Sequence, residues 1–239
     1  MALRRRLLAT AATAMLVVPA TVTAQITAGQ TDDFEDGTTQ GWIVGAAFDP
    51  PNPAPPTNVA TGGPGGDGDS FLRLTALGGD GPGSRLSVLN LNAQWSGDWL
   101  AAGITHVQMH AINMGSTDLF LRIMIADPIP GPPTNVAFSA TPIFVPAGSD
   151  WMRISFPLFG PGGLVAVEGS LDAALSGATE LRLFHSEEFT FPPPAVEAVL
   201  GVDNITAAVV PEPGTFILLG SGIVVLLAIG RRGRRTVAR

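Results

Sequence analysis

The amino-acid sequence predicts an all-β fold, a sandwich or a barrel, for the middle of the chain. Glycine and proline, at 29 and 21 of 239 residues, are frequent and gather in short clusters. Between the clusters, strand-length segments alternate apolar and polar side chains, as half-buried strands do. No long amphipathic helix, heptad or internal repeat is visible in the sequence, which excludes a doubly wound α/β fold and a helical bundle.

About eight strands are expected. Segment 105–111 alternates most clearly, because its apolar residues at 107, 109 and 111 fall on one face and its histidines and glutamine on the other. Only segment 169–175 has the pattern of a short helix. The expected strands are an opening strand near residue 33 and segments 70–75, 85–89, 105–111, 119–125, 151–156, 180–185 and 201–207.

The first 24 residues are expected to be a signal peptide that is removed on export. They contain three arginines at 4–6, an apolar run over 7–18 and small or compact residues at 22–24, where a signal peptidase would cut. An uncleaved N-terminal membrane anchor is the alternative. The apolar run is short for a span of about 20 residues and ends at Pro19, which favours cleavage.

The C-terminus carries three targeting features in order. They are a Pro-Glu-Pro sequence at Pro211, Glu212 and Pro213, an apolar run over 215–229, and five arginines after the run. Proline fixes φ and lacks an N–H donor, so the Pro-Glu-Pro segment resists helix and strand and is expected to be accessible beside a membrane. The arginines hold their end in the cytoplasm by the positive-inside rule, which places residues 25–210 outside.

This order of features resembles the PEP-CTERM sorting signal of bacterial exported proteins. The resemblance implies that an exosortase-like membrane enzyme recognises Pro211, Glu212 and Pro213 and removes the helix from an inner-membrane-anchored precursor. The product would be periplasmic, cell-surface or extracellular. An ordinary C-terminal membrane anchor behind a proline-containing linker is the alternative. The expected organisation is a signal peptide at 1–24, a short linker at 25–31, a β-sandwich domain at 32–208, the sorting motif at 209–214, a transmembrane helix at 215–230 and an Arg-rich cytoplasmic stop at 231–239.

Formal charge separates the two ends from the body of the chain. Of 13 basic residues, three lie in the signal peptide and five follow the apolar run, which leaves five arginines against 19 of the 20 acidic residues. The body therefore has a formal net charge near −14, which repels phosphate backbones and excludes nucleic acid as a partner. The sequence has no cysteine, so disulfides, thiol catalysis and thiolate zinc sites are excluded.

Two short motifs carry a second resemblance. Segment 33–42 opens with Asp-Phe-Glu-Asp-Gly and ends in Gly-Trp, and segment 201–206 reads Gly-Val-Asp-Asn-Ile-Thr. They are similar to the first and last strands of galactose-binding-like jelly-roll modules, a fold that many carbohydrate-binding modules share. The resemblance covers roughly residues 32–208. It implies a jelly-roll β-sandwich and a polysaccharide ligand.

The jelly-roll resemblance also implies a structural calcium ion where the first and last strands meet. Carried over to this sequence, Glu35 and Asp203 are the ligand candidates, and Asp33 points to the same side of its strand as Glu35. The loop that contains Asp67 and Asp69 offers further oxygen ligands, of which calcium takes about six to eight. The alternative is that the strand residues are solvated and that the loop aspartates only shape a turn.

Four tryptophans are candidates for stacking on sugar rings, since sugars present apolar faces as well as hydroxyls. Trp42 and Trp151 fall at positions that are expected in the core. Trp95 and Trp99 flank a polar segment that is expected to be exposed, so they are the glycan-binding candidates. Core packing or anchoring of a loop is the alternative role for both.

His106, Gln108 and His110 share the polar face of segment 105–111 and are further glycan-binding candidates. Residues at i and i+4 on a strand lie about 13 Å apart, too far for the two histidines to chelate one ion. On a concave sheet face the three side chains would donate hydrogen bonds to a ligand. The alternative is that they face solvent or are satisfied within the protein.

No catalytic motif is visible in the sequence. It contains no Gly-x-Ser-x-Gly elbow, His-Glu-x-x-His helix or phosphate loop. Glu187 and Glu188 are neighbours that would point to opposite faces of a strand, unlike the paired acids of glycosidases. The sequence therefore predicts an exported, non-catalytic protein whose jelly-roll domain binds an extracellular polysaccharide. The first alternative is a structural biofilm or matrix protein without a glycan site, and the second is a polysaccharide hydrolase.

Overall fold

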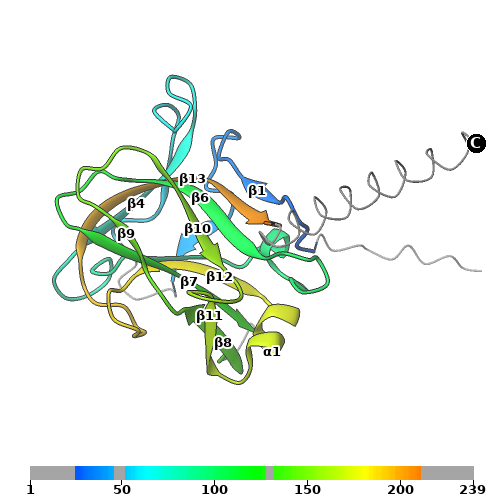
Figure 1. Ribbon diagram of the computed structural model, residues 1–239. Helices are drawn as coiled ribbons and strands as arrows, with labels where there is room; N and C mark the ends of the chain where they lie inside the picture. The colour runs from blue at the N-terminus through cyan, green and yellow to red at the C-terminus, as the bar shows by residue number, and fades with distance from the viewer. Residues whose placement is uncertain (1–24, 46–51, 128–131, 211–239) are drawn as a thin grey trace, which may run out of the picture.

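Thirteen strands, one short α-helix and one 3₁₀ turn make up the part of the chain that the computed structural model describes, residues 25–45, 52–127 and 132–210 (Figure 1). The strands form two antiparallel sheets that pack face to face, so the expected all-β sandwich is confirmed. The expected signal peptide, the Pro-Glu-Pro residues, the transmembrane helix and the Arg-rich stop lie outside the described residues. Within the described ranges, no helix is both long and apolar enough to cross a membrane.

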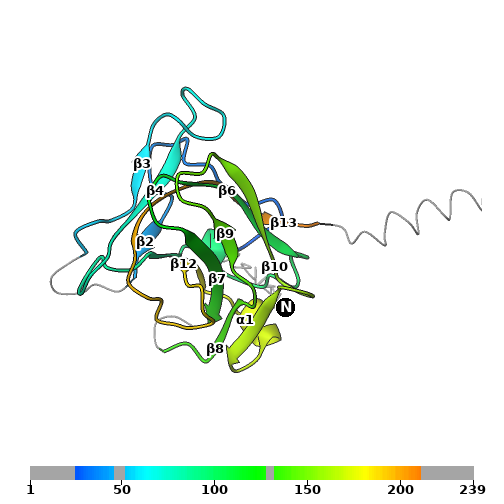
Figure 2. The ribbon, with the colours of Figure 1, turned by 60° about the vertical axis from the view of Figure 1, so that its left-hand side comes forward.

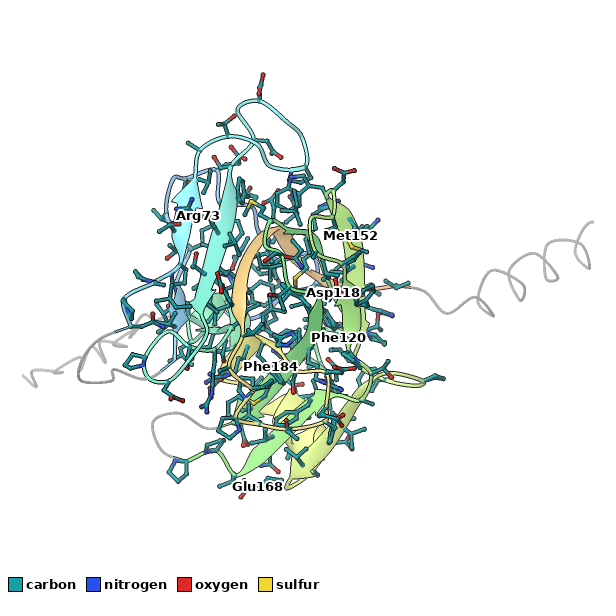
Figure 3. The ribbon with its side chains drawn as sticks, turned by 90° about the vertical axis from the view of Figure 1, so that its left-hand side faces the viewer. Arg73, Asp118, Phe120, Met152, Glu168 and Phe184 are labelled. Carbon is teal, nitrogen blue, oxygen red and sulfur yellow. The ribbon has the colours of Figure 1, made fainter. Side chains whose placement is uncertain are left out.

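Sheet A contains six of the described strands, of which β1 pairs only with β13. Figure 3 shows it from β4, marked by Arg73, to β10, marked by Met152, with β13 between them. The order across sheet A is β10 (Met152–Pro157), β6 (His106–Asn113), β13 (Glu197–Ala208), β4 (Phe71–Leu77) and β3 (Thr57–Val59), with β1 (Thr31–Asp32) beside β13.

Sheet B contains seven described strands, of which β9 pairs only with β7. The helix α1 (Leu171–Ser176) packs against its β7 and β8 strands and lies beside β8 in Figure 2. The order across sheet B is β11 (Leu164–Glu168), β8 (Asn135–Ser139), β7 (Leu119–Asp127), β12 (Glu180–His185), β5 (Ser87–Asn90) and β2 (Trp42–Val44), with β9 (Ile143–Val145) beside β7.

The main core lies between the two sheets and is built from the inward faces of the strands. Strand β6 shows the predicted alternation, because its odd-numbered residues are buried and its even-numbered ones are partly exposed. The expected helix at 169–175 is also present, as α1, and Ser170 caps it by accepting a hydrogen bond from the backbone N–H of Ala173 at 3.2 Å. Short strands of three to five residues, such as β3, β8, β9 and β11, were not predicted because alternation cannot be recognised over so few positions.

The outer face of sheet B carries a second apolar cluster, formed by Met124, Ala126, Val136, Phe138 and Phe184. Segment 186–193, which follows β12, passes over this cluster. Strand β7 is therefore buried along almost its whole length, on both faces, and departs from simple alternation. This covered face positions the site described below.

Candidate functional site

The two tryptophans that were expected to be exposed are buried. Trp95 and Trp99 both have 0% of their surface exposed. The indole N–H of Trp95 donates to Asp32 Oδ2 at 2.7 Å, and that of Trp99 donates to the carbonyl of Trp95 at 3.2 Å. The polar residues between them are partly exposed, whereas the η1 turn (Ala93–Trp95) directs the first indole into the core. The expected exposure of Trp95 and Trp99 is wrong, and neither ring can reach a sugar.

The other two tryptophans also occupy different environments. Trp42 is buried in the main core, as expected. Trp151 is partly exposed rather than in the core, and contacts Phe71 edge-on with ring centroids 5.4 Å apart. Gly201 of β13 leaves room for this packing, since an added Cβ would lie 3.1 Å from the Phe71 ring and 2.6 Å from Ile112. The core position expected for Trp151 is therefore wrong.

Asp32 is a buried carboxylate that was not predicted from the sequence. It accepts hydrogen bonds from Trp42 Nε1 at 2.8 Å, from Trp95 Nε1 at 2.7 Å and from Gln94 Nε2 at 2.9 Å. Burial raises the pKa of Asp32, and these hydrogen bonds oppose the rise. The sequence signal was weak, because Asp32 and Asp33 are consecutive and β1 is too short to show which of them faces inward.

His106, Gln108 and His110 lie on the outer face of sheet A, partly exposed, at the predicted alternation. Gln108 is already engaged by the neighbouring strand: its Oε1 accepts from Arg153 Nη2, and its Nε2 donates to Ser155 Oγ at 3.3 Å. His110 pairs in register with Asp203 of β13, and its Nδ1 is buried without a hydrogen-bond partner among the described residues. A ligand role for these three side chains stays a prediction.

The predicted calcium ligands approach one another around Asp203, which has 0% of its surface exposed. Burial, together with the charges of Asp69, Glu35 and Asp33, raises the pKa of Asp203 to about 7. Negative charge therefore accumulates where the resemblance implied a cation. However, no three acidic or histidine side chains among the described residues are grouped closely enough to hold a metal ion. Charge thus favours a calcium ion and side-chain geometry does not, so calcium binding stays a prediction.

A pocket of about 480 Å³ opens beside the outer face of sheet B, at the edge formed by β2 and β5. Its volume is within the range of small-ligand sites. Apolar and polar groups both line it. Its residues come from five separate segments of the chain, so no contiguous sequence motif marks it. The lining residues are Val44, Gly45, Asn52, Gly81, Pro82, Gly83, Ser84, Arg85, Ser87, Arg182, Phe191, Pro192 and Pro193.

Arg182 is the most constrained polar group of this pocket. Its Nε forms an ion pair with Glu180, and its Nη1 donates to Ser87 Oγ at 3.2 Å. Its guanidinium lies 5.3 Å from the centroid of the Phe191 ring, a cation–π distance. Gly45 packs against it, since an added Cβ there would lie 3.0 Å from Arg182 Nη1. The guanidinium is therefore held in place before any ligand arrives.

Phenylalanines supply the aromatic wall beside Arg182. Phe191 contacts Phe184 and Phe138 at ring-centroid distances of 5.7 and 5.8 Å, and Phe189 contacts Phe138 at 5.6 Å. Phe184 belongs to β12 and is labelled in Figure 3. Phe191 remains 41% exposed, although its neighbours Phe138 and Phe184 are buried. The pocket therefore has a fixed aromatic ring that solvent, and a ligand, can reach.

Arg122 holds segment 186–193 on the sheet. This buried guanidinium donates to the carbonyls of Ser139, Ser186 and Glu187 at 2.6, 2.9 and 2.8 Å. Burial lowers its pKa. Because the carbonyls of Ser186 and Glu187 belong to the segment that carries Phe191, Arg122 is a positioning residue for the aromatic wall.

The C-terminal segment of the chain matches a known protein-sorting motif. Residues 209–235 match the PEP-CTERM protein-sorting motif. The predicted sorting signal is therefore confirmed, and it implies export and processing by an exosortase. The match covers the end of the chain and leaves the β-sandwich unassigned. Among curated protein sequences, nothing matches this chain significantly.

Solved structures resemble the β-sandwich. An exo-β-agarase is 14% identical with a TM-score of 0.53, and the match covers 75% of this chain and 25% of the agarase chain. This likeness shows a shared fold, and this chain spans about a quarter of the agarase.

Two carbohydrate-binding modules are similar as well. The family 11 module from Clostridium thermocellum, solved with a β-1,3-1,4-mixed-linked tetrasaccharide, is 15% identical, with 79% of this chain and 99% of the module covered and a TM-score of 0.47. The CBM22-1 xylan-binding domain from Paenibacillus barcinonensis Xyn10C is 14% identical, with 78% and 99% covered and a TM-score of 0.43.

The arrangement at the sheet B pocket suits a ligand that is polar on its edges and apolar on a face. Phe191 offers an aromatic surface, and Arg182, Ser87 and Asn52 offer hydrogen-bonding groups around it. Sugars have this character, because their hydroxyls surround faces of C–H groups. The side chains that line the pocket include none of the residues that the sequence analysis put forward for glycan binding.

Proposed function

We propose that the protein is an exported, non-catalytic jelly-roll module that binds a polysaccharide in the sheet B pocket, at the cell surface or in the extracellular matrix. The C-terminal helix would anchor the precursor in the membrane until an exosortase-like enzyme removes it. Export is supported by the sorting motif at 209–235. The binding function is supported by one observation above all, the exposed ring of Phe191 held against Arg182 in a pocket of about 480 Å³.

Rigidity supports a binding role for this pocket. Glu180 and Ser87 hold the guanidinium of Arg182, and Arg122 holds the backbone of the segment that carries Phe191. Little conformational entropy is therefore lost when a ligand binds. The resemblance of segments 33–42 and 201–206 to jelly-roll modules adds a separate, sequence-based argument. The proposed glycan site is therefore this pocket, and not Trp95 and Trp99 as the sequence predicted.

Binding of the full-length protein, purified in detergent, to a panel of immobilised polysaccharides tests this function. The wild type is expected to bind at least one polymer, and Phe191→Ala is expected to weaken that binding about tenfold or more. Phe159→Ala is the matched control, because Phe159 is 42% exposed, close to the 41% of Phe191, and does not line the pocket. The proposal would be contradicted if the wild type bound no polysaccharide, or if Phe191→Ala and Phe159→Ala lost binding equally.

A structural matrix protein is the second candidate function, and a specific surface favours it. Phe144 of β9 and Val165 and Val167 of β11 are large apolar side chains that are 44–46% exposed on sheet B. Exposed apolar groups on an edge strand are suited to contacts with other proteins. Absence of glycan binding together with self-association of the protein would favour this candidate.

A further inference from the structure

We infer that the sheet B pocket binds an anionic sugar, one that carries a carboxylate or a sulfate group, through Arg85 and Arg182. This inference rests on the proposed function and narrows it to a class of ligand.

Positive charge is concentrated at this pocket. The body of the chain has only five arginines against 19 acidic residues. Two of the five, Arg85 and Arg182, line the pocket, and no acidic residue is among its described lining residues. A third, Arg122, lies on the same outer face of sheet B, beneath segment 186–193. In so acidic a protein, a pocket whose described lining holds two arginines and no acidic residue favours a negative ligand.

Both arginines have hydrogen-bonding capacity to spare. Arg182 uses Nε and Nη1 within the protein, and its Nη2 donates to no described residue. Arg85 is exposed and makes no hydrogen bond or ion pair within the described ranges. Guanidinium groups bind carboxylates and sulfates through paired N–H donors, and such charge-assisted bonds are roughly twice as strong as neutral ones.

Glu180 offsets the charge of Arg182, so Arg85 supplies the net positive charge of the pocket and Arg182 contributes its Nη2 donor. Glu180 is only 4% exposed and its carboxylate is bonded to Arg182 Nε, so little of it is presented to a ligand. Ser84, Ser87 and Asn52 line the same pocket and can bond to sugar hydroxyls, and Phe191 can cover an apolar sugar face. The pocket thus combines the groups that an acidic sugar residue requires.

The overall acidity of the body is compatible with this ligand. At physiological ionic strength the Debye length is about 8 Å, so carboxylates far from the pocket repel a polyanion only weakly. The same carboxylates disfavour attachment of a polyanion elsewhere on the surface. An acidic polymer would therefore be directed to the pocket that Arg85 and Arg182 line.

Paired polymers that differ only in charge test the inference. Polygalacturonate is compared with its carboxyl-reduced form, and dextran sulfate with dextran, using the full-length protein. The first pair tests a carboxylate and the second a sulfate. Arg85→Gln is the main variant, since Arg85 has no described partner to lose. Arg73→Gln is the matched control, because it removes the same charge from an exposed position on sheet A.

The wild type is expected to bind at least one charged polymer about tenfold or more tightly than its neutral counterpart. Arg85→Gln should remove most of this difference, and Arg73→Gln should preserve it. Equal binding to charged and neutral polymers, lost in Phe191→Ala, would overturn the anionic preference but leave polysaccharide binding intact. An equal loss in Arg85→Gln and Arg73→Gln would show unspecific attraction and also overturn the inference. Failure to bind any polymer, neutral ones included, would overturn the proposed function together with this inference.

Discussion

A single buried carboxylate, Asp32, holds two of the tryptophans inside the sandwich. Trp42 and Trp95 donate their indole N–H groups to the same oxygen of Asp32, and Gln94 donates to the other oxygen. A polar group inside a core must find a partner, because an unsatisfied one costs about 1–3 kcal/mol. Asp32 provides such a partner for both indoles, and this explains why tryptophans near a polar segment turn inward.

Replacement of Asp32 is expected to destabilise the fold strongly. Asp32→Ala leaves two buried indole N–H groups without an acceptor and opens a cavity, so the free energy of unfolding should fall by about 2–4 kcal/mol. Denaturant unfolding, monitored by tryptophan fluorescence, measures this change. Asp33→Ala is the control, since Asp33 is exposed and should cost less than about 1 kcal/mol. Equal effects of the two changes would contradict the role assigned to Asp32.

At the scale of elements, three segments meet around Asp203. They are β13, the turn that holds Asp33 and Glu35, and the loop that contains Asp69. The loop is tied to the turn by the backbone N–H of Ser70, which donates to Glu35 Oε1 at 2.8 Å. Burial and the three neighbouring carboxylates therefore oppose ionisation of Asp203.

This arrangement predicts a pH dependence of stability. Because the pKa of Asp203 rises from 3.8 to about 7 on folding, the folded state binds the proton more tightly than the unfolded state. The resulting stabilisation is fully present below pH 3.8 and is lost as the pH rises through about 7. The raised pKa of Asp32 acts in the same direction. Without added metal, the melting temperature should fall as the pH rises from 3.8 to about 7 and then level off.

Two variants and added calcium test whether Asp203 causes the fall in melting temperature with pH. Asp203→Asn should flatten the pH profile, whereas Asp80→Asn, at an exposed position, should leave it unchanged. A calcium ion at this junction would favour ionised Asp203, so added Ca²⁺ should raise the melting temperature at pH 8 and a chelator should reverse the effect. If neither Ca²⁺ nor the chelator changed the melting temperature, the predicted calcium site would be contradicted.

Segment 186–193 is the element that creates the pocket wall. Arg122 fixes it from below through backbone carbonyls, and Phe189 and Phe191 pack onto the outer face of sheet B. Without this segment, Phe138 and Phe184 would be exposed on that face. One element therefore serves both stability and binding.

At the scale of the whole molecule, the all-β sandwich was predictable from alternation and turn residues, as β6 shows. The sorting signal was predictable because its residues are contiguous. The pocket was not, since Gly45, Arg85, Arg182 and Phe191 come together only when β2, β5, β12 and the segment after β12 have folded. The orientation of Trp95 was also hidden, because its acceptor lies 63 residues away in sequence.

The location of a bound sugar tests the central claim most directly. A crystal structure of the protein with an oligosaccharide cut from the polymer it binds would show that location. The sugar is expected in the sheet B pocket, against the Phe191 ring and within hydrogen-bond distance of Arg182. A sugar bound instead on the outer face of sheet A, at His110 and Trp151, would contradict the account.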